Sequence, residues 1–320
     1  MTADSQNMGR DVTLCGWRVR SAVPLPALLP WSGDDRPPDI TIRIGRVAVP
    51  EGLPFQRAFM RIAADGTGWV TVPDVVRMQI RGGAEVTVDP LIDVGAPDIA
   101  LFLLGSGLGV LCHQRRILPL HGSCVELDGQ AILFCGPSGQ GKSTLAAALA
   151  AQGLRVLSDD VTPVLLPPDG PPLAVPSYPR QKLWQDSLTA LGLTAGERVR
   201  QAGEIEKFSC DLAARFCPRP LPVAAAIHLT TEKKPGQPLL SPLRGGTGLL
   251  VLRRSVYRAE IAGWLRPEDG LFHDLVRLAS GVALATLRRP ADLARLDAFA
   301  AALPDHLRAT FIREGSSGAG

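Results

Sequence analysis

A short loop between an apolar segment and a helix-forming segment constrains this chain more than any other feature. The loop, residues 136–144, reads GPSGQGKST and satisfies the pattern GxxxxGK[ST]. The apolar run AILFC at 131–135 precedes it as a predicted strand, and STLAAALAAQ at 143–152 follows it as a predicted helix. A strand, a glycine-rich turn and a helix in this order predict an α/β domain with a phosphate-binding loop.

Each part of this loop has a physical role in holding a triphosphate. Glycines permit the tight turn in which successive backbone N–H groups face one anion, and the following helix points its N-terminus at the phosphates. We expect Lys142 to reach the β- and γ-phosphates and the Ser143 hydroxyl to bind Mg²⁺. ATP and Mg²⁺ are therefore the predicted cofactors. The predicted nucleotide-binding residues are Gly136, Pro137, Ser138, Gly139, Gln140, Gly141, Lys142, Ser143 and Thr144.

Two alternatives to a working loop are a chance match in a glycine-rich chain and a degenerate loop that no longer binds nucleotide. The strand before the loop and the helix after it count against a chance match. The intact Lys142 and Ser143 count against degeneracy.

A pair of aspartates, Asp159 and Asp160, ends the next predicted strand at residues 154–160. Ligands of an open α/β sheet collect at the carboxyl ends of its strands, so we expect these carboxylates near the phosphates. One can hold Mg²⁺ while the other accepts a proton from an attacking hydroxyl. Successive side chains of a strand point to opposite faces, so the two are not expected to share one role. The alternative is a solvated Ser-Asp-Asp turn.

His121 precedes the run SCVEL at 123–127, which pairs in pattern with residues 131–135 as a hairpin turning at 128–129. Such a hairpin would bring His121 beside the phosphate loop. A structural histidine without a role in the site is an equal alternative.

Composition narrows the class of protein. Hydrophobic residues make up 46% of the 320 residues, which favours a folded chain with a substantial core. The 34 basic and 31 acidic residues nearly balance, so no nucleic-acid partner is predicted. The six cysteines include no CxxC pair and no zinc spacing, which indicates reduced thiols of a cytoplasmic protein.

No membrane span is predicted. The longest apolar run, residues 99–112, has 14 residues including three glycines, whereas a spanning helix needs about 20. The start of the chain, MTADSQNMGRDVTL, lacks the apolar stretch of a secretory signal.

Changes of pattern along the chain predict its domains. Short alternating runs separated by Gly, Pro and Asp predict a small β-rich N-terminal domain, and an α/β pattern follows an apolar stretch. The predicted divisions are a disordered N-terminus at 1–11, the β-rich domain at 12–95, an apolar helical connector at 96–116, the P-loop domain at 117–312 and a disordered tail at 313–320.

Some local expectations in the P-loop domain concern regularity and burial. Apolar spacing predicts that residues 271–307 are helical, and the proline-rich stretch 163–176 is expected to be irregular. Trp184 and Trp264 are predicted to be core aromatics rather than substrate platforms.

Three features together resemble the catalytic domain of bacterial HPr kinase/phosphorylase: the His-Gly pair at 121–122, the loop GPSGQGKS, and the Ser-Asp-Asp run at 158–160. His121 lies 21 residues before Lys142, and Asp159 lies 17 residues after it. Both separations are similar to those of that family, whereas ordinary P-loop proteins place their acidic strand further along.

The resemblance implies a P-loop kinase fold similar to that of phosphoenolpyruvate carboxykinase around the nucleotide. It implies that Asp159 is the catalytic base, that Asp160 lies at the metal and phosphates, and that His121 lies near the same groups as Lys142. The implied activity is ATP-dependent transfer of the γ-phosphate to a hydroxyl, with serine of a peptide or small protein as acceptor. The related kinases form oligomers, so a homo-oligomer is also implied.

The resemblance covers about residues 117–165 and weakens afterwards. The family carries a glutamate metal ligand in a Glu-Ile-Arg-Gly stretch, whereas residues 177–184 read SYPRQKLW, so neither that ligand nor phosphorylase activity is implied. YPRQKLW and the EKFSCDL run at 206–212 resemble divergent HPr-kinase-related proteins, some encoded with lasso peptide biosynthesis. A lasso precursor peptide is therefore one candidate acceptor.

Basic residues after the aspartates are candidates for reading the substrate. Arg180, Lys182 and Lys207 can clamp a phosphate or an acidic peptide, although inert surface charge is the alternative for each. Two other functions stay open: a nucleotide-gated binding module without transferase activity, and a small-molecule kinase. A carboxykinase would need further metal ligands and substrate arginines that the sequence does not reveal.

Overall fold

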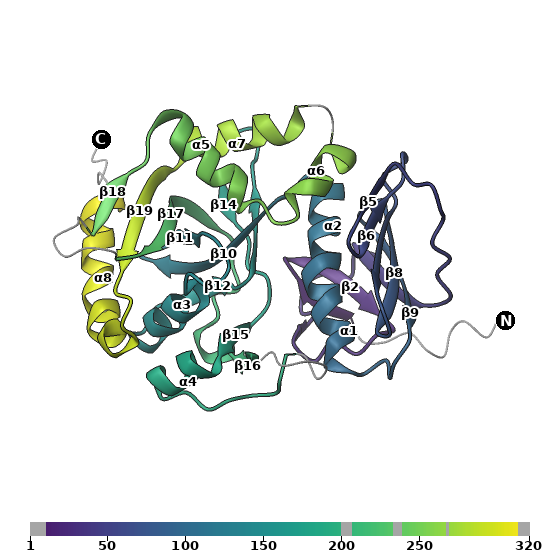
Figure 1. The fold of residues 1–320 in the computed structure, drawn as a ribbon, viewed down its shortest axis with the longest axis horizontal. Helices are drawn as coiled ribbons and strands as arrows, with labels where there is room; N and C mark the ends of the chain where they lie inside the picture. Colours follow the sequence, from purple (N-terminus) through teal and green to yellow (C-terminus); the bar gives the residue numbers. More distant parts are fainter. Residues whose placement is uncertain (1–10, 200–206, 233–238, 267–268, 313–320) are drawn as a thin grey trace.

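The computed structural model describes residues 11–199, 207–232, 239–266 and 269–312. Within these ranges the chain forms two large sheets that lie on either side of a helical segment (Figure 1). Disordered ends are predicted at 1–11 and 313–320; residues 1–10 and 313–320 lie outside the described residues, whereas Asp11 begins the first strand, β1.

The N-terminal sheet has nine strands in the order β3-β1-β2-β4-β9-β8-β7-β6-β5. Its strands alternate buried and half-exposed residues, as in β8, where Val76, Met78 and Ile80 are buried and Arg77 and Gln79 are not. This period of two gives the sheet one apolar face. The strands are β1 Asp11–Leu14, β2 Trp17–Ser21, β3 Leu29–Pro30, β4 Ile40–Ile44, β5 Phe55–Arg57, β6 Met60–Ile62, β7 Gly68–Val72, β8 Val76–Arg81 and β9 Glu85–Pro90.

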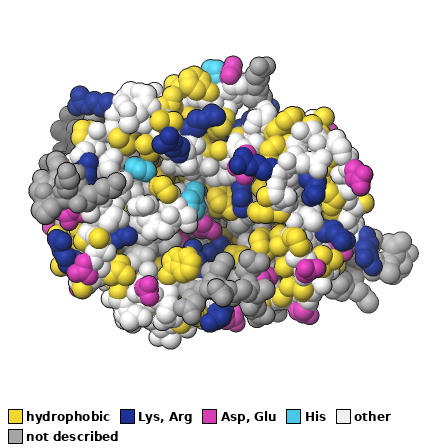
Figure 2. Space-filling view, viewed as in Figure 1, with side chains coloured by type: hydrophobic (Ala, Val, Ile, Leu, Met, Phe, Trp, Pro, Cys, Tyr) yellow, Lys and Arg dark blue, Asp and Glu magenta, His cyan; other side chains and the backbone are white. Residues whose placement is uncertain are grey.

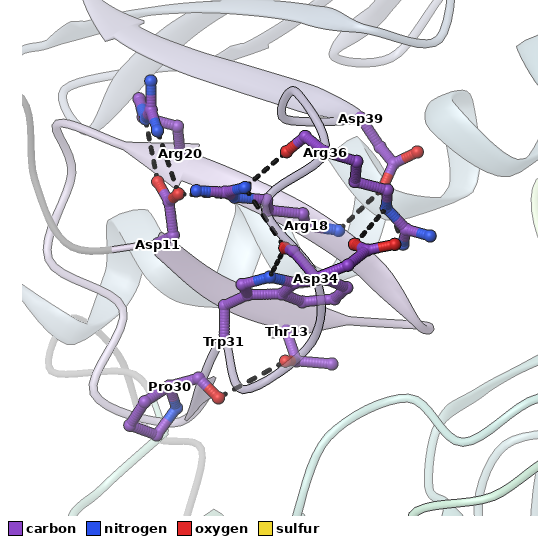
Figure 3. Close-up of polar contacts among 9 residues, drawn as sticks. All are labelled: Asp11, Thr13, Arg18, Arg20, Pro30, Trp31, Asp34, Arg36 and Asp39. Atoms are coloured by element: carbon purple, nitrogen blue, oxygen red, sulfur yellow. Dashed lines mark hydrogen bonds and ion pairs between the residues drawn. The ribbon is translucent and has the colours of Figure 1, made fainter.

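A polar network links β1, β2 and the segment that follows β3, near one end of this sheet (Figure 3). The Asp11 carboxylate accepts hydrogen bonds from Arg18 Nε at 2.6 Å and from Arg20 Nε at 2.8 Å. Hydrogen bonding from Arg20, with a smaller contribution from Arg18, holds the pKa of Asp11 below its usual range although burial acts the other way. The guanidinium of Arg36 lies 4.8 Å from the ring centre of Trp31.

Residues 97–114 form one helical segment between the two sheets: α1 Pro97–Phe102, a π-helical turn Leu103–Gly107 and α2 Leu108–Gln114. The π turn and α2 are buried throughout, apart from Gln114. Three residues after α2 ends, the chain enters β10, Leu118–Leu127, so the helix leads directly into the second sheet. Nowhere in the described ranges does a helix reach the length and apolarity that crossing a membrane requires.

The second sheet is organised around β10, which changes partner half-way along. Residues 118–121 pair with β13, and residues 122–127 pair with β11 in the predicted hairpin, whose turn at 128–129 is confirmed. The strands are β10, β11 Gln130–Cys135, β12 Arg155–Ser158, β13 Val161–Leu165, β14 Leu173–Ala174, β17 Leu221–Thr231, β18 Leu240–Pro242 and β19 Ala283–Arg289, and a separate hairpin joins β15 Arg180–Trp184 to β16 Lys207–Asp211.

Helices cover both faces of this sheet (Figure 1). On one face α3 packs with α8 over an apolar cluster that includes Phe134 and Ile227, and on the other α5 packs with α7 over a cluster that includes Leu133 and Leu252. The chain therefore has mixed α/β architecture with the phosphate loop between β11 and α3. The helices are α3 Lys142–Ala151, α4 Gln185–Leu191, α5 Gly245–Ser255, α6 Ala259–Leu265, α7 Gly270–Gly281 and α8 Leu296–Phe311.

Three local expectations are wrong. The predicted helix over 271–307 is interrupted by β19, which pairs in parallel with β17 and buries Ala285 and Leu287, because sheet pairing outweighs the apolar spacing. Part of the proline-rich stretch is strand, in β13 and β14. Trp184, at the end of β15, and Trp264, near the end of α6, are 47% and 45% exposed rather than buried, because both lie at the surface ends of their elements.

Candidate functional site

A cavity of about 260 Å³ lies over the N-terminus of α3. The loop residues from 138 to 144, except Gln140, contribute to its wall. Other parts of the chain bring charged side chains to the same wall from β10, from the turn between β12 and β13, and from the β15–β16 hairpin. These side chains are His121, Asp160, Lys182 and Lys207. The rest of the lining comprises Trp184, Asp186 and Ser187 from the end of β15 and the start of α4, together with Arg289, Ala291 and Leu293.

The loop adopts a conformation that only glycine tolerates easily. Gly136, Gly139 and Gly141 have φ values of 144°, 83° and 81°, in the left-handed half of the backbone map where a Cβ is costly. The loop turns around the Lys142 ammonium, which donates hydrogen bonds to the carbonyl oxygens of Gly136 at 2.9 Å and Pro137 at 3.0 Å. The first residues of α3 also line the cavity, and the N-terminus of a helix favours an anion.

Lys142 also contacts His121. The sequence alone did not decide whether this histidine lies in the site or is only structural. The Lys142 ammonium lies 3.1 Å from His121 Nε2, and His121 Nδ1 lies 2.9 Å from the carbonyl oxygen of Asp160. An ammonium can only donate, so Nε2 accepts and Nδ1 carries the proton that is donated to Asp160. The imidazole is neutral in this arrangement. Burial, followed by the positive charge of Lys142, lowers the pKa of His121.

Asp160 is one of the two aspartates that line the cavity; the other, Asp186, is an exposed residue in the first turn of α4. The Oδ2 of Asp160 accepts from Lys182 Nζ at 2.9 Å, and its Oδ1 lies 3.4 Å from His121 Nδ1. Burial acts to raise the pKa of Asp160, but the charge and hydrogen bond of Lys182 outweigh it and hold the pKa well below the usual range. β12 ends at Ser158, and Asp160 follows with a left-handed backbone, φ of 68°, just before β13 begins.

Asp159 lies behind the cavity wall rather than in its lining. It is 3% exposed, and both of its carboxylate oxygens are occupied within the protein. Oδ1 accepts from Ser123 Oγ at 2.6 Å, and Oδ2 accepts from the backbone N–H of Lys182 at 3.0 Å. The carboxylate therefore ties β15 to β10.

The basic residues expected to read the substrate separate into two groups. Lys182 and Lys207 line the cavity, and the Lys207 ammonium lies 5.6 Å from the ring centre of Trp184. Arg180 lines a neighbouring groove instead. Alternation along β15 explains the partly exposed Arg180 and Lys182 on either side of Gln181, which is buried and donates to the backbone oxygen of Ser143.

Two further residues support the site and were missed in the sequence. Arg289, at the end of β19, donates to the carbonyl oxygen of Gln140 at 2.8 Å and fills the space where a side chain at Gly141 would lie. It was missed because residues 271–307 were expected to be helical. Ser123 holds Asp159, and its position two residues after His121 on a strand was a usable signal.

The donor set at the cavity fits Mg²⁺ shared with a nucleotide. The Ser143 hydroxyl and the Asp160 carboxylate are the hard oxygen ligands expected of such a site, and both line the cavity. Mg²⁺ is commonly held by one or two protein oxygens together with phosphates and water. Within the described ranges, no group of three or more His, Cys, Asp or Glu side chains is placed to hold a metal by itself.

The surface drawn in Figure 2 shows basic and acidic side chains interspersed. This face carries no broad basic patch of the kind that binds a nucleic-acid backbone.

Comparison with known proteins gives a local likeness. Over 86 residues the chain is 34% identical to the HPr kinase/phosphorylase of Lactobacillus delbrueckii subsp. bulgaricus. That match covers 27% of this chain and spans 27% of the relative's length. No protein-family model matches the chain.

A solved structure of the Hpr(Ser) kinase/phosphatase from Coxiella burnetii aligns with 60% of this chain and 96% of its own. The TM-score is 0.33 and the sequence identity is 14%.

Proposed function

We propose that this chain is an ATP-dependent kinase that transfers the γ-phosphate to a hydroxyl, with serine of a peptide or small protein as acceptor. The observation that carries the proposal is the meeting of a phosphate-binding loop with His121, Asp160 and Lys182 around one cavity. The loop suffices for nucleotide binding. Phosphoryl transfer also needs a carboxylate to accept the proton and positive charge at the phosphates, which Asp160 and Lys182 supply beside the loop. The local likeness to HPr kinase/phosphorylase supports the same reaction.

The loop and α3 would hold the triphosphate, with Lys142 exchanging one of its carbonyl contacts for a phosphate oxygen. Ser143 would hold Mg²⁺ together with phosphate and water oxygens, and the metal would supply neutralisation of phosphate charge when bound; Asp160 is then left to act on the acceptor hydroxyl. Lys182 and Lys207 add positive charge at the same wall, where negative charge develops as the bond breaks. His121 keeps the Lys142 ammonium in place through a neutral nitrogen.

In the transfer step the acceptor oxygen forms a bond to the γ-phosphorus, and the bond from that phosphorus to the bridging oxygen breaks. ADP leaves with the electron pair, and the hydroxyl proton passes to a carboxylate. The family resemblance assigns this base to Asp159. The burial of Asp159 and the position of Asp160 in the cavity lining favour Asp160, with Asp159 as a positioning residue.

A second candidate is a nucleotide-gated binding module. The helical segment at 97–114 leads into β10, the strand that carries His121, and this connection favours the module. A shift of His121 on nucleotide binding would be transmitted through β10 to the helical segment and the N-terminal sheet. A small-molecule kinase is the third. Three finer points rest on the sequence resemblance alone: a lasso precursor peptide as acceptor, a carboxykinase-like fold and a homo-oligomer.

The test is to incubate the protein with Mg²⁺ and ATP labelled in the γ-phosphate, together with serine-containing peptides. Transfer of label to peptide supports the kinase and excludes a pure binding module. Lys142→Ala should abolish both transfer and calorimetric binding of MgATP, whereas Arg43→Ala, at an exposed position of the N-terminal sheet, should change neither. MgATP binding with no transfer to peptide, water or small alcohols would reject the kinase in favour of the module.

A further inference from the structure

A second hollow adjoins the nucleotide cavity and has a different character. This groove encloses about 360 Å³ between the N-terminal part of the chain and the β15–β16 hairpin. One wall is a single face of the helical segment, with Ala100, Leu101 and Leu104 at helical spacing. Pro26 and Ala27, from the loop after β2, extend the same wall. The wall is apolar and suits a hydrophobic side chain.

The opposite wall leads to the reacting groups. Lys182 lines both the groove and the nucleotide cavity, and its ammonium lies 2.9 Å from Asp160 Oδ2. Tyr178, which lines the groove, is buried and lies close enough to Lys182 and Asp160 for their charges to act on it. A molecule in the groove that extends past Lys182 therefore reaches the carboxylate that faces the phosphate loop.

The rim of the groove is positively charged. Arg180 and Arg198 line it, and neither guanidinium forms an ion pair within the part of the chain that the structure describes. Glu197 is the one carboxylate among the described lining residues. Guanidinium groups bind carboxylates in a bidentate fork, so an acidic occupant complements this rim.

We propose that this groove is the acceptor site and that it binds an extended polypeptide segment with an apolar and an acidic side chain near the phosphorylated residue. The apolar side chain packs on the face of the helical segment, the acidic one meets Arg180 and Arg198, and the hydroxyl lies beyond Lys182. A segment with two kinds of side chain matches the two walls, whereas a small polar molecule would leave the apolar wall unused. This inference rests on the proposed kinase function.

The test uses synthetic serine peptides in which leucine, and then either aspartate or lysine, is placed at each position in turn. Transfer of labelled γ-phosphate is measured for the full-length protein and for two groove variants. Ala100→Trp fills the apolar wall, and Arg198→Glu reverses the charge of the rim. Their matched controls are Ala301→Trp, at an exposed position of α8, and Arg43→Glu on the N-terminal sheet. MgATP binding is measured in parallel by calorimetry.

We expect the unmodified protein to prefer leucine–aspartate peptides over leucine–lysine peptides by about tenfold in kcat/KM. Arg198→Glu should remove or reverse that preference, and Ala100→Trp should lower transfer to all peptides at least about tenfold, with MgATP affinity unchanged in both. The controls should behave as the unmodified protein.

Four results would overturn the acceptor groove: no preference for acidic peptides, the same kinetics in both groove variants, transfer to small alcohols but not to peptides, or label on the chain itself, which would make a segment of this chain the occupant. In each of these, MgATP binding and γ-phosphate release still report on the proposed function. Failure of MgATP binding would instead reject the kinase.

Discussion

The two neighbouring aspartates should give opposite phenotypes when each is changed to asparagine. Asp159 is buried and accepts from Ser123 Oγ and from the Lys182 backbone N–H. In Asp159→Asn the amide oxygen can still accept from the Lys182 N–H, and the NH₂ group can donate to the Ser123 oxygen. Both contacts survive as neutral hydrogen bonds, so the variant should fold.

The expected cost follows from the change in bond type. Hydrogen bonds to a charged group contribute about 1.5–3 kcal/mol and neutral ones about 1 kcal/mol, so two such changes should lower the free energy of unfolding by about 1–4 kcal/mol. Asp159→Ala leaves both donors unpaired and should cost more, about 3–5 kcal/mol. Urea denaturation with an unchanged m-value measures both.

Activity separates the aspartates further. If Asp159 only positions β15, Asp159→Asn should keep kcat within about tenfold of the unmodified protein, while Asp160→Asn should lose about 10²–10⁴-fold as a lost general base does. The measurement is transfer of labelled γ-phosphate at saturating MgATP. A fall of a hundredfold or more in Asp159→Asn, with its stability intact, would refute the positioning role and return the base to Asp159.

Three other predictions follow from single contacts. In Gly122→Ala the new Cβ would lie 2.6 Å from a backbone oxygen of the facing strand, so the free energy of unfolding should fall by about 1–3 kcal/mol and the melting temperature with it. Gly246→Ala, which has open space around it in α5, should not destabilise the fold. The pKa of His121 is lowered from 6.5 in the folded protein, so the neutral imidazole stabilises the fold above pH 6.5. This contribution to the free energy of unfolding is lost as the pH falls through the lowered pKa. Urea titrations at a series of pH values should show the loss in the unmodified protein and not in His121→Gln. The pKa of Asp11 is also lowered, so Asp11→Asn should cost on the order of 1 kcal/mol at neutral pH and progressively less toward about pH 3; an equal cost at both pH values would contradict the ion-pair assignment.

The phosphate loop and its hairpin were predictable because their signals are local. The turn at 128–129 and the glycines of the loop need backbone conformations that few residues adopt, and the sequence displays them directly. β19 was not predictable, because GVALATLRR fits a helix as well as a strand until β17 is present to pair with it. Arg289, at the end of β19, was therefore not predicted as a site residue.

The arrangement of the aspartates also lay beyond local pattern. Alternation along a strand predicts opposite sides for Asp159 and Asp160, and the two carboxylates do lie apart, although β12 ends at Ser158 and both residues follow it. Alternation does not say which of them faces the cavity. That depends on the left-handed backbone at Asp160 and on Ser123, which lies on another strand and holds Asp159.

The partner change within β10 has a consequence for the order of folding. The segment from β10 through β11 and α3 to β12 is contiguous in the chain, so its contacts close short loops and can form early. The parallel pairing of β11 with β17, and then of β17 with β19, brings in strands that lie about 90 and 150 residues after β11 in the chain, so these contacts close long loops and form later. We therefore expect substitutions at the 128–129 turn to slow folding and substitutions in β19 to speed unfolding, which would make the phosphate loop an early product of folding and its support by Arg289 a late one.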